Sequence, residues 1–139
     1  MLIVVDANVI CSAMLAKGET INLLYSDELE AIAPELLFNE VEKHKDELLK
    51  KSKLSEDEFN KVLLLLKRRV RIIPIEEFKD FLLKANKLLK LHTKDTEYIA
   101  LAMKYNCPLW SKEKLLKKLK EIKVLDASEV SKLVKTGYH

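Results

Sequence analysis

The residues Leu2-Ile3-Val4-Val5-Asp6 form the stretch that decides the fold of this chain. The four apolar residues, with β-branched side chains among them, predict a short strand that is buried on both faces. This strand ends abruptly in a carboxylate. In an open parallel sheet, ligands bind beyond the carboxyl ends of the strands. Asp6 is therefore predicted to be either a helix cap or a working group of a site.

Four further apolar stretches predict strands that alternate with helical patterns. The strands are expected at residues 2–5, 30–33, 70–75, 107–110 and 122–125. The helices are expected at residues 7–16, 20–26, 34–51, 55–69, 76–90, 94–105, 112–120 and 127–135. This alternation predicts a three-layer α/β/α fold, in which helices cover both faces of a parallel sheet. The helices at 34–51 and 55–69 are expected to form a helical hairpin between the second and third strands.

The composition is typical of a globular protein. With 139 residues and a hydrophobic content of 48%, the chain is predicted to form a single domain over residues 1–139. No apolar run is long enough to span a bilayer, and no signal-peptide pattern is found, so we expect a cytoplasmic protein without a membrane contact. Cys11 and Cys107 are then expected to be reduced, buried thiols.

The charged residues are more informative in kind than in sum. A net charge of +3 is too small to indicate nucleic-acid binding by itself. Lysine provides 22 of the 25 basic residues and glutamate 15 of the 22 acidic residues, whereas glutamine is absent. This bias is typical of proteins from hot environments, and it says nothing about activity.

Four acidic residues are predicted to meet at one rim of the sheet. Asp6 follows the first strand, and Glu113 lies three residues after Trp110, the last residue of the fourth strand. Asp95 lies in the first turn of the helix that leads to the fourth strand, and Glu40 lies on an apolar helix face after the second strand. Because crossover helices begin at the edge where parallel strands end, these side chains are expected to share that edge.

Each of these acids also has a purely structural interpretation. Asp6 would cap a helix, and Asp95 would interact favourably with a helix dipole. Glu40 would pair with a lysine, although a glutamate on an apolar face is rarely buried without a partner. Glu113 lies among lysines and would be a solvated surface charge. The functional interpretation depends on the four acids acting together.

Carboxylates that share a site need positive charge or protons. Two like charges about 4 Å apart repel by roughly 4 kcal/mol at an effective dielectric constant near 20. Such a cluster therefore retains protons or binds cations. Oxygen ligands without a cluster of cysteine and histidine favour Mg²⁺ or Mn²⁺ over zinc. A site of this kind suits the hydrolysis of phosphodiester bonds.

Four segments resemble the PIN-domain family, the nuclease fold of VapC-type toxins and of many stand-alone archaeal proteins. These segments are V-V-D-A-N-V at 4–9, P-E-L-L-F-N-E-V at 34–41, K-D-T-E-Y-I-A-L-A at 94–102 and L-W-S-K-E at 109–113. The resemblance implies a five-stranded parallel sheet in the order 3-2-1-4-5. It also implies a metal-dependent ribonuclease that uses Mg²⁺ or Mn²⁺ and acts on RNA, with an antitoxin as partner if the chain is a toxin.

The resemblance assigns roles to the acids by their positions. Asp6, Glu40 and Asp95 match the family acids that hold the metal, and Glu113 completes the expected catalytic set. The family usually has an aspartate two residues after a serine or threonine. Here Ser111 takes the hydroxyl place, as a supporting residue, and Glu113 takes the acid place. The longer glutamate side chain places its carboxylate about one methylene further out.

Further candidates lie near the acids in the sequence. Asn8 matches a family position whose polar side chain helps to orient the site. Lys112 and Lys114 flank the fourth acid, and we expect them to contact RNA phosphates. His44, one turn beyond Glu40, is expected to pack or to support a ligand rather than to bind a metal.

Other protein classes fit this sequence less well. A haloacid-dehalogenase-like phosphatase needs a second acid at the position of Asn8, and a response-regulator receiver needs paired acids near the first strand. A non-catalytic module that binds RNA or a protein remains the alternative. The apolar stripe of the helix at 55–69 would cover the protein's own core or form a homodimer face. Dependence of cleavage on Mg²⁺ or Mn²⁺ and on Asp6 separates a nuclease from a binding module.

Overall fold

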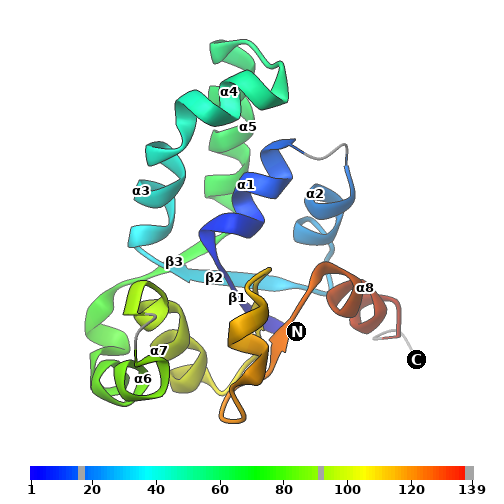
Figure 1. Cartoon of the computed structure of the whole chain (residues 1–139). Coiled ribbons are helices and arrows are strands. Elements are labelled where there is room, and N and C mark those ends of the chain that lie inside the picture. Colours follow the sequence, from blue (N-terminus) through cyan, green and yellow to red (C-terminus); the bar gives the residue numbers. More distant parts are fainter. Residues whose placement is uncertain (16–17, 91–92, 137–139) are drawn as a thin grey trace.

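The central strand of the sheet is the one predicted from the opening stretch. In the computed structural model, which describes residues 1–15, 18–90 and 93–136, β1 pairs with a parallel strand on each side. The sheet has five strands in the order β3-β2-β1-β4-β5 (Figure 1), which confirms the order that the resemblance implied. The strands span Leu2–Val5 (β1), Glu30–Pro34 (β2), Arg71–Ile73 (β3), Leu109–Trp110 (β4) and Val124–Leu125 (β5).

Strand β1 is buried on both faces, as predicted. The side chains of Ile3, Val4 and Val5 are 0% exposed, which is the burial expected of a central parallel strand. Its register with β4 pairs Val5 with Trp110. These two residues end neighbouring strands. The residues that follow them are therefore brought together at the rim formed by the carboxyl ends of the strands.

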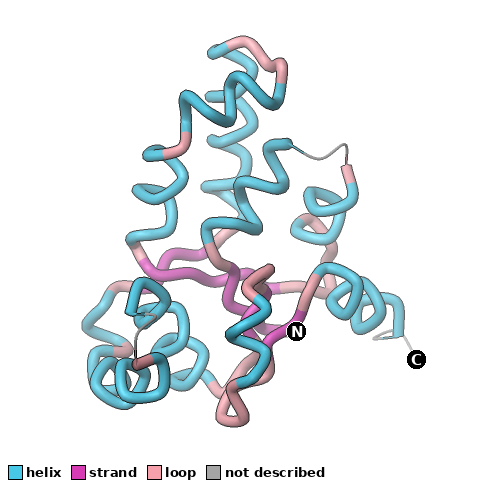
Figure 2. The backbone as a smooth tube through the Cα atoms, in the orientation of Figure 1, coloured by secondary structure: helices cyan, strands magenta, loops and turns pink. Residues whose placement is uncertain are grey.

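Helices cover both faces of this sheet (Figures 1 and 2). One face carries α1, α3, α4 and α5, and the other carries α6 and α7, of which α7 contacts β1 and β2. Helix α8 packs against α2 and β5. The α-helices span Ala7–Leu15 (α1), Glu19–Leu24 (α2), Leu36–Lys43 (α3), Lys45–Ser52 (α4), Glu56–Arg69 (α5), Leu82–Leu89 (α6), Thr96–Tyr105 (α7) and Ala127–Thr136 (α8). Short 3-10 turns span Ile75–Glu77 (η1), Lys79–Phe81 (η2), Thr93–Asp95 (η3) and Lys114–Lys118 (η4).

The predicted hairpin is present, but its first arm is two helices rather than one. The predicted helix 34–51 is interrupted at His44, whose φ of −100° and ψ of 9° are not helical. The break turns α4 so that Leu48, 4% exposed, is buried and α4 contacts α1. Helix α5 forms the second arm and begins, as predicted, at Ser55. The Ser55 hydroxyl accepts the Glu58 N–H, and the Glu58 carboxylate accepts the Ser55 N–H, which is a capping box.

Three other predicted helices are shorter than expected. The predicted helix 76–90 begins with η1 and η2, because the backbone leaves the helical region at Phe78, whose side chain is buried. The predicted helix 112–120 is reduced to η4, in which only Leu116 is buried. The predicted helix 94–105 begins with η3 before α7. The predicted end of the first helix, at residue 16, lies outside the described residues.

Other expectations can be compared directly with the structure. Asp126 caps α8, because its Oδ1 accepts the Glu129 N–H at 2.9 Å. Cys11 and Cys107 are free thiols, as predicted, but they are half-buried rather than buried. Across the described part of the chain, no helix combines the length and the apolar character needed to cross a membrane.

Candidate active site

Asp6 is a helix cap and a buried acid at the same time. Its side chain lies between β1 and α1 and is 4% exposed, and its Oδ1 accepts the Val9 N–H at 3.1 Å. Burial raises the pKa of the Asp6 carboxyl to about 6, although hydrogen bonds from Ser111 and Val9 act in the opposite direction. The negative charges of Asp95 and Glu113 raise the same pKa further. Asp6 is therefore a helix cap, and its burial among negative charges is also compatible with a working group of a site.

Ser111 connects the ends of β1 and β4. It directly follows β4, as Asp6 follows β1, and its side chain is 0% exposed. The Ser111 hydroxyl donates to the Asp6 carboxylate, and its Oγ accepts the Glu113 N–H at 3.1 Å. This serine therefore orients the carboxylate of Asp6 and the backbone at Glu113 through one hydroxyl group.

Glu40 reaches the same rim from α3. Its Oε1 accepts the hydroxyl of Tyr98 on α7 at 2.7 Å. Tyr98 is 2% exposed and belongs to the core, as expected. Burial and the hydrogen bond to Glu40 both raise the pKa of the Tyr98 hydroxyl, so it remains a proton donor at neutral pH. A buried phenol from one face of the sheet thus holds the carboxylate that extends from the other face.

Asp95 completes a set of three carboxylates around one small hollow. It is the last residue of η3 and precedes α7. Asp6, Glu40 and Asp95 line a hollow of about 180 Å³, which we call the carboxylate hollow. They come from the residue after β1, from α3 and from η3, which lie far apart in the sequence. The structure therefore brings together three of the four acids that the sequence singled out.

The fourth acid, Glu113, lies beside this hollow rather than in its lining. It is half-buried in the segment between β4 and η4, and its charge raises the pKa of Asp6. The Lys94 Nζ lies 3.8 Å from the Glu113 Oε1. Lys94 also lines the carboxylate hollow, so the lysine that approaches Glu113 belongs to the wall around the other three acids.

The donor set of the carboxylate hollow fits a hard divalent cation. All three acids present carboxylate oxygens, the ligands preferred by Mg²⁺ and Mn²⁺, and Asp6 is buried among other negative charges. Within the described residues, however, no three His, Cys, Asp or Glu side chains stand close enough to form a complete metal-binding cluster. A bound cation would therefore have to draw these carboxylates closer together.

The residues that were predicted to support the site or to bind RNA lie in different surroundings. Asn8 and His44 both line the carboxylate hollow, and both also line a second hollow on its α1–α4 side, together with Lys112. Lys114 is exposed in the first turn of η4, and the linings of these two hollows, as far as the structure describes them, do not include it. The structure thus gives different surroundings to two lysines that the sequence could not distinguish.

Two groups in the site were not assigned to it from the sequence. Lys94 directly precedes Asp95. This position next to a candidate acid could have indicated from the sequence that Lys94 belongs to the site. Tyr98 lies three residues after Asp95, on the same helical face, but its contact with Glu40 joins residues 58 positions apart. No local pattern predicts such a contact, because it depends on how α3 and α7 pack around the sheet.

Comparison with known proteins identifies the class to which this fold and site belong. Residues 4–129 match the family described as PIN domain, so the chain belongs to the PIN domain family, as the resemblance indicated. No curated protein matches the chain.

Two solved structures share the fold. One is a toxin–antitoxin complex from Klebsiella pneumoniae, with a TM-score of 0.66, 15% identity, and coverage of 89% of this chain and 96% of the other. The second is VapBC2 from Rickettsia felis bound to a DNA fragment from its promoter, with a TM-score of 0.69, 15% identity, and coverage of 91% and 98%. At this level of identity, the likeness concerns the fold.

Proposed function

We propose that the chain is a metal-dependent ribonuclease, a single PIN domain over residues 1–139 that hydrolyses phosphodiester bonds of RNA with Mg²⁺ or Mn²⁺. The observation that carries this proposal is the carboxylate hollow, where Asp6, Glu40 and Asp95 converge from separate connections of a parallel sheet. Membership of the PIN domain family supports the same assignment. The place of the hollow at the carboxyl ends of β1 and β4 agrees with the general position of ligand sites in such sheets.

In this proposal the carboxylates of Asp6, Glu40 and Asp95 would hold the cation, and Glu113 would support a second or water-bridged position. A bound divalent cation would supply positive charge next to the phosphate and the departing oxygen and would lower the pKa of water. Water attacks phosphorus in line with the departing oxygen, and the P–O bond breaks without a covalent intermediate on the protein.

The chain's own groups orient the reacting carboxylates. Ser111 and the Val9 N–H hold the Asp6 carboxylate from one side, and the Tyr98 hydroxyl holds Glu40. Because these donors are fixed by core packing, each carboxylate is held in a defined orientation, although a bound cation would still have to draw the carboxylates closer together. The Lys94 ammonium group at the wall of the hollow adds positive charge next to a bound phosphate.

Cleavage of a labelled single-stranded RNA tests the proposal. We expect cleavage with Mg²⁺ or Mn²⁺, no cleavage in excess EDTA, and a loss of about 100-fold or more in kcat/KM for Asp6→Asn and Glu40→Gln, since each removes charge that stabilises the reacting phosphate. Glu42→Gln is the matched control, because Glu42 is exposed on the same helix and pairs with Lys67. If RNA is bound but never cut under any of these metal conditions, the chain is a binding module instead.

The proposed partners are RNA and an antitoxin. RNA is proposed as the substrate because the chain belongs to the PIN domain family, and an antitoxin is proposed because the two structural neighbours are toxin–antitoxin proteins. We therefore propose a toxin with a cognate antitoxin as the biological setting, in the cytoplasm, with a homodimer as its candidate assembly. The apolar stripe of α5 covers the protein's own core, because Phe59, Leu63 and Leu66 are buried. Leu64 and Leu65 are 50% and 51% exposed, so the proposed homodimer face is the outer side of α5 rather than that stripe.

A further inference from the structure

A second hollow adjoins the carboxylate hollow, between α1 and α4. It has a volume of about 300 Å³, and we call it the α1–α4 groove. The two hollows share Asn8 and His44 in their linings, so they are neighbouring parts of one depression. The proposed function uses the carboxylate hollow and leaves the α1–α4 groove without a role.

Helical spacing explains why polar groups face each other across this groove. Asn8, Ser12 and Leu15 line it from α1, and His44 and Lys51 line it from α4 and the residue before it. These positions are separated by three, four or seven residues, so each set lies on one face of its helix. The groove therefore lies between the facing sides of two packed helices.

The charge of the groove is opposite to that of the neighbouring hollow. Lys51 and Lys112 line the groove with one carboxylate, Glu47, whereas the carboxylate hollow has three carboxylates and one ammonium group. The Lys51 Nζ lies 2.6 Å from Glu47 in an exposed ion pair, and such a pair contributes little stability. Lys51 can therefore exchange this partner for a phosphate at small cost.

We propose that the α1–α4 groove binds the nucleotide of a single-stranded RNA that neighbours the scissile phosphate. The inference rests on the proposed function, since a phosphate at the carboxylates places the next nucleotide within reach of the shared wall of Asn8 and His44. Lys51 and Lys112 attract its phosphate, and the Asn8 amide and Ser12 hydroxyl offer hydrogen bonds to the base or ribose. A volume of about 300 Å³ lies at the lower end for ligand sites, which suits one nucleotide rather than a duplex.

Binding measured without metal tests the groove independently of cleavage. Anisotropy of a fluorescein-labelled, six-nucleotide RNA in EDTA gives the affinity. We expect Lys51→Ala and Lys112→Ala each to weaken binding by about 3- to 10-fold at low salt. Each substitution should also reduce the slope of log affinity against log salt concentration by about 0.7, because one phosphate of the single strand is then no longer neutralised.

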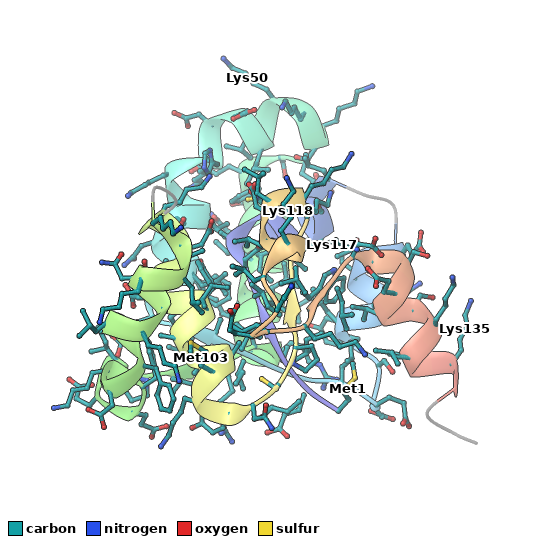
Figure 3. The ribbon with its side chains drawn as sticks, turned by 60° about the horizontal axis from the view of Figure 1, so that its bottom comes forward. Met1, Lys50, Met103, Lys117, Lys118 and Lys135 are labelled. Atoms are coloured by element: carbon teal, nitrogen blue, oxygen red, sulfur yellow. The ribbon has the colours of Figure 1, made fainter. Side chains whose placement is uncertain are left out.

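Two matched controls remove one lysine charge, as the test variants do, but at positions outside the groove. Lys50 neighbours Lys51 on α4 and extends outward from the outer end of that helix (Figure 3). Lys120 lies eight residues after Lys112 and is exposed just beyond η4. Lys50→Ala and Lys120→Ala are expected to change the affinity by less than about 2-fold. Equal weakening by all four variants would show a diffuse electrostatic surface and would overturn the proposal.

Cys11 provides a natural probe inside the groove. Its half-buried thiol is part of the groove lining, whereas Cys107 lines a different hollow beside Met103 and Pro108. The same RNA is expected to slow alkylation of Cys11 by N-ethylmaleimide by about threefold or more and to leave the Cys107 rate unchanged, because ligands bury most of their surface in such sites. Measurable RNA binding without protection of Cys11 would mean that the groove serves another ligand, such as a protein segment.

A small substrate separates this inference from the proposed function. Bis(p-nitrophenyl) phosphate carries a phosphodiester without base or ribose, so Lys51→Ala and Lys112→Ala should lower RNA cleavage and leave its hydrolysis unchanged. An equal loss of hydrolysis rate with both substrates would mean that these lysines act at the carboxylates, and it would overturn the proposal that the groove binds a nucleotide. If wild-type protein cuts neither substrate, the ribonuclease assignment fails, while binding and alkylation still decide whether the groove holds RNA.

Discussion

At the scale of single residues, the central finding is that Asp6 both caps a helix and lines the carboxylate hollow. It accepts the Val9 N–H as a helix cap, and it is 4% exposed at the wall of the carboxylate hollow. A buried carboxylate next to Asp95 and Glu113 is destabilised in its charged form. The protein therefore carries a local electrostatic penalty at neutral pH that a bound cation would relieve.

This penalty predicts a pH dependence of stability. Because the folded-state pKa of about 6 lies above the ordinary 3.8, the folded chain binds more protons in this range, and the contribution of Asp6 to stability falls as pH rises from about 4 to about 6. The Asp6→Asn variant has no carboxyl group at this position, so its stability does not fall in this way. In EDTA, the free energy of unfolding of the variant minus that of wild type should therefore increase by up to about 3 kcal/mol between about pH 4 and pH 7. Urea denaturation measures this difference.

Asp126→Asn is the control of opposite sign. The Glu129 N–H and then Lys117 lower the pKa of the Asp126 carboxyl, so its stabilising effect is present at neutral pH and lost as pH falls. Its substitution should therefore destabilise the protein more at pH 7 than at acid pH. A constant difference between Asp6→Asn and wild type at every pH would contradict the raised pKa of Asp6.

At the scale of elements, the connections carry information that helix and strand patterns miss. The break at His44 separates α3, which carries Glu40, from α4, which forms one wall of the groove. A straight helix over 34–51 would satisfy the apolar periodicity equally well. Beyond the break, Leu48 is buried and α4 contacts α1, an arrangement that depends on tertiary packing.

Arg69 at the end of α5 shows how one side chain holds several elements in place. Its guanidinium donates to the carbonyl oxygens of Leu24, Ser26 and Leu29, at 2.5, 2.5 and 3.1 Å, in the segment that leads from α2 into β2. It also lies 5.6 Å from the ring centroid of Tyr25. One half-buried cation thereby satisfies carbonyl groups that the helix end and the turn leave without intrahelical partners.

Replacement of Arg69 should destabilise the fold. Arg69→Met keeps much of the apolar stem but leaves three carbonyl groups without the guanidinium, so we expect a loss of about 2 kcal/mol in the free energy of unfolding. Denaturant titration by circular dichroism measures it. Arg68→Met is the control, because Arg68 is exposed one residue earlier, and it should change stability by less than about 0.5 kcal/mol. Equal effects would show that Arg69 acts only through net charge.

At the scale of the whole molecule, the sheet order decides which residues meet. Because β1 lies between β2 and β4, the connections after β1 and β4 share one rim, and α3 and η3 bring Glu40 and Asp95 to it. The three carboxylates thus link elements from both faces of the sheet. A cation bound by all of them should stabilise the folded chain as a unit.

Thermal unfolding measures this coupling. At a Mn²⁺ concentration about 100 times its Kd, the free energy of unfolding should rise by about 2.7 kcal/mol, which corresponds to about 10 °C in Tm for a chain of this size. Asp6→Asn should lose most of this shift, and Glu42→Gln should retain it. An equal shift in Asp6→Asn would mean that Mn²⁺ binds elsewhere on the protein.

The sequence by itself determined the parts of this protein that depend on local chemistry. The apolar run of residues 2–5 predicts the central strand, and Ser55 and Asp126 predict two helix starts, because strand burial and capping act over a few residues. The family segments also predicted the strand order and the four acids. These signals are carried by neighbouring residues, so they can be read without the fold.

Only the tertiary structure decided how the acids are held and what lies beside them. The Tyr98–Glu40 hydrogen bond, the approach of Lys94 to Glu113 and the groove between α1 and α4 all join residues far apart in the sequence. Such contacts depend on the angles at which helices pack on the sheet and on the break before α4. Local periodicity leaves these undetermined, because many packings bury the same apolar faces and only one brings these polar groups together.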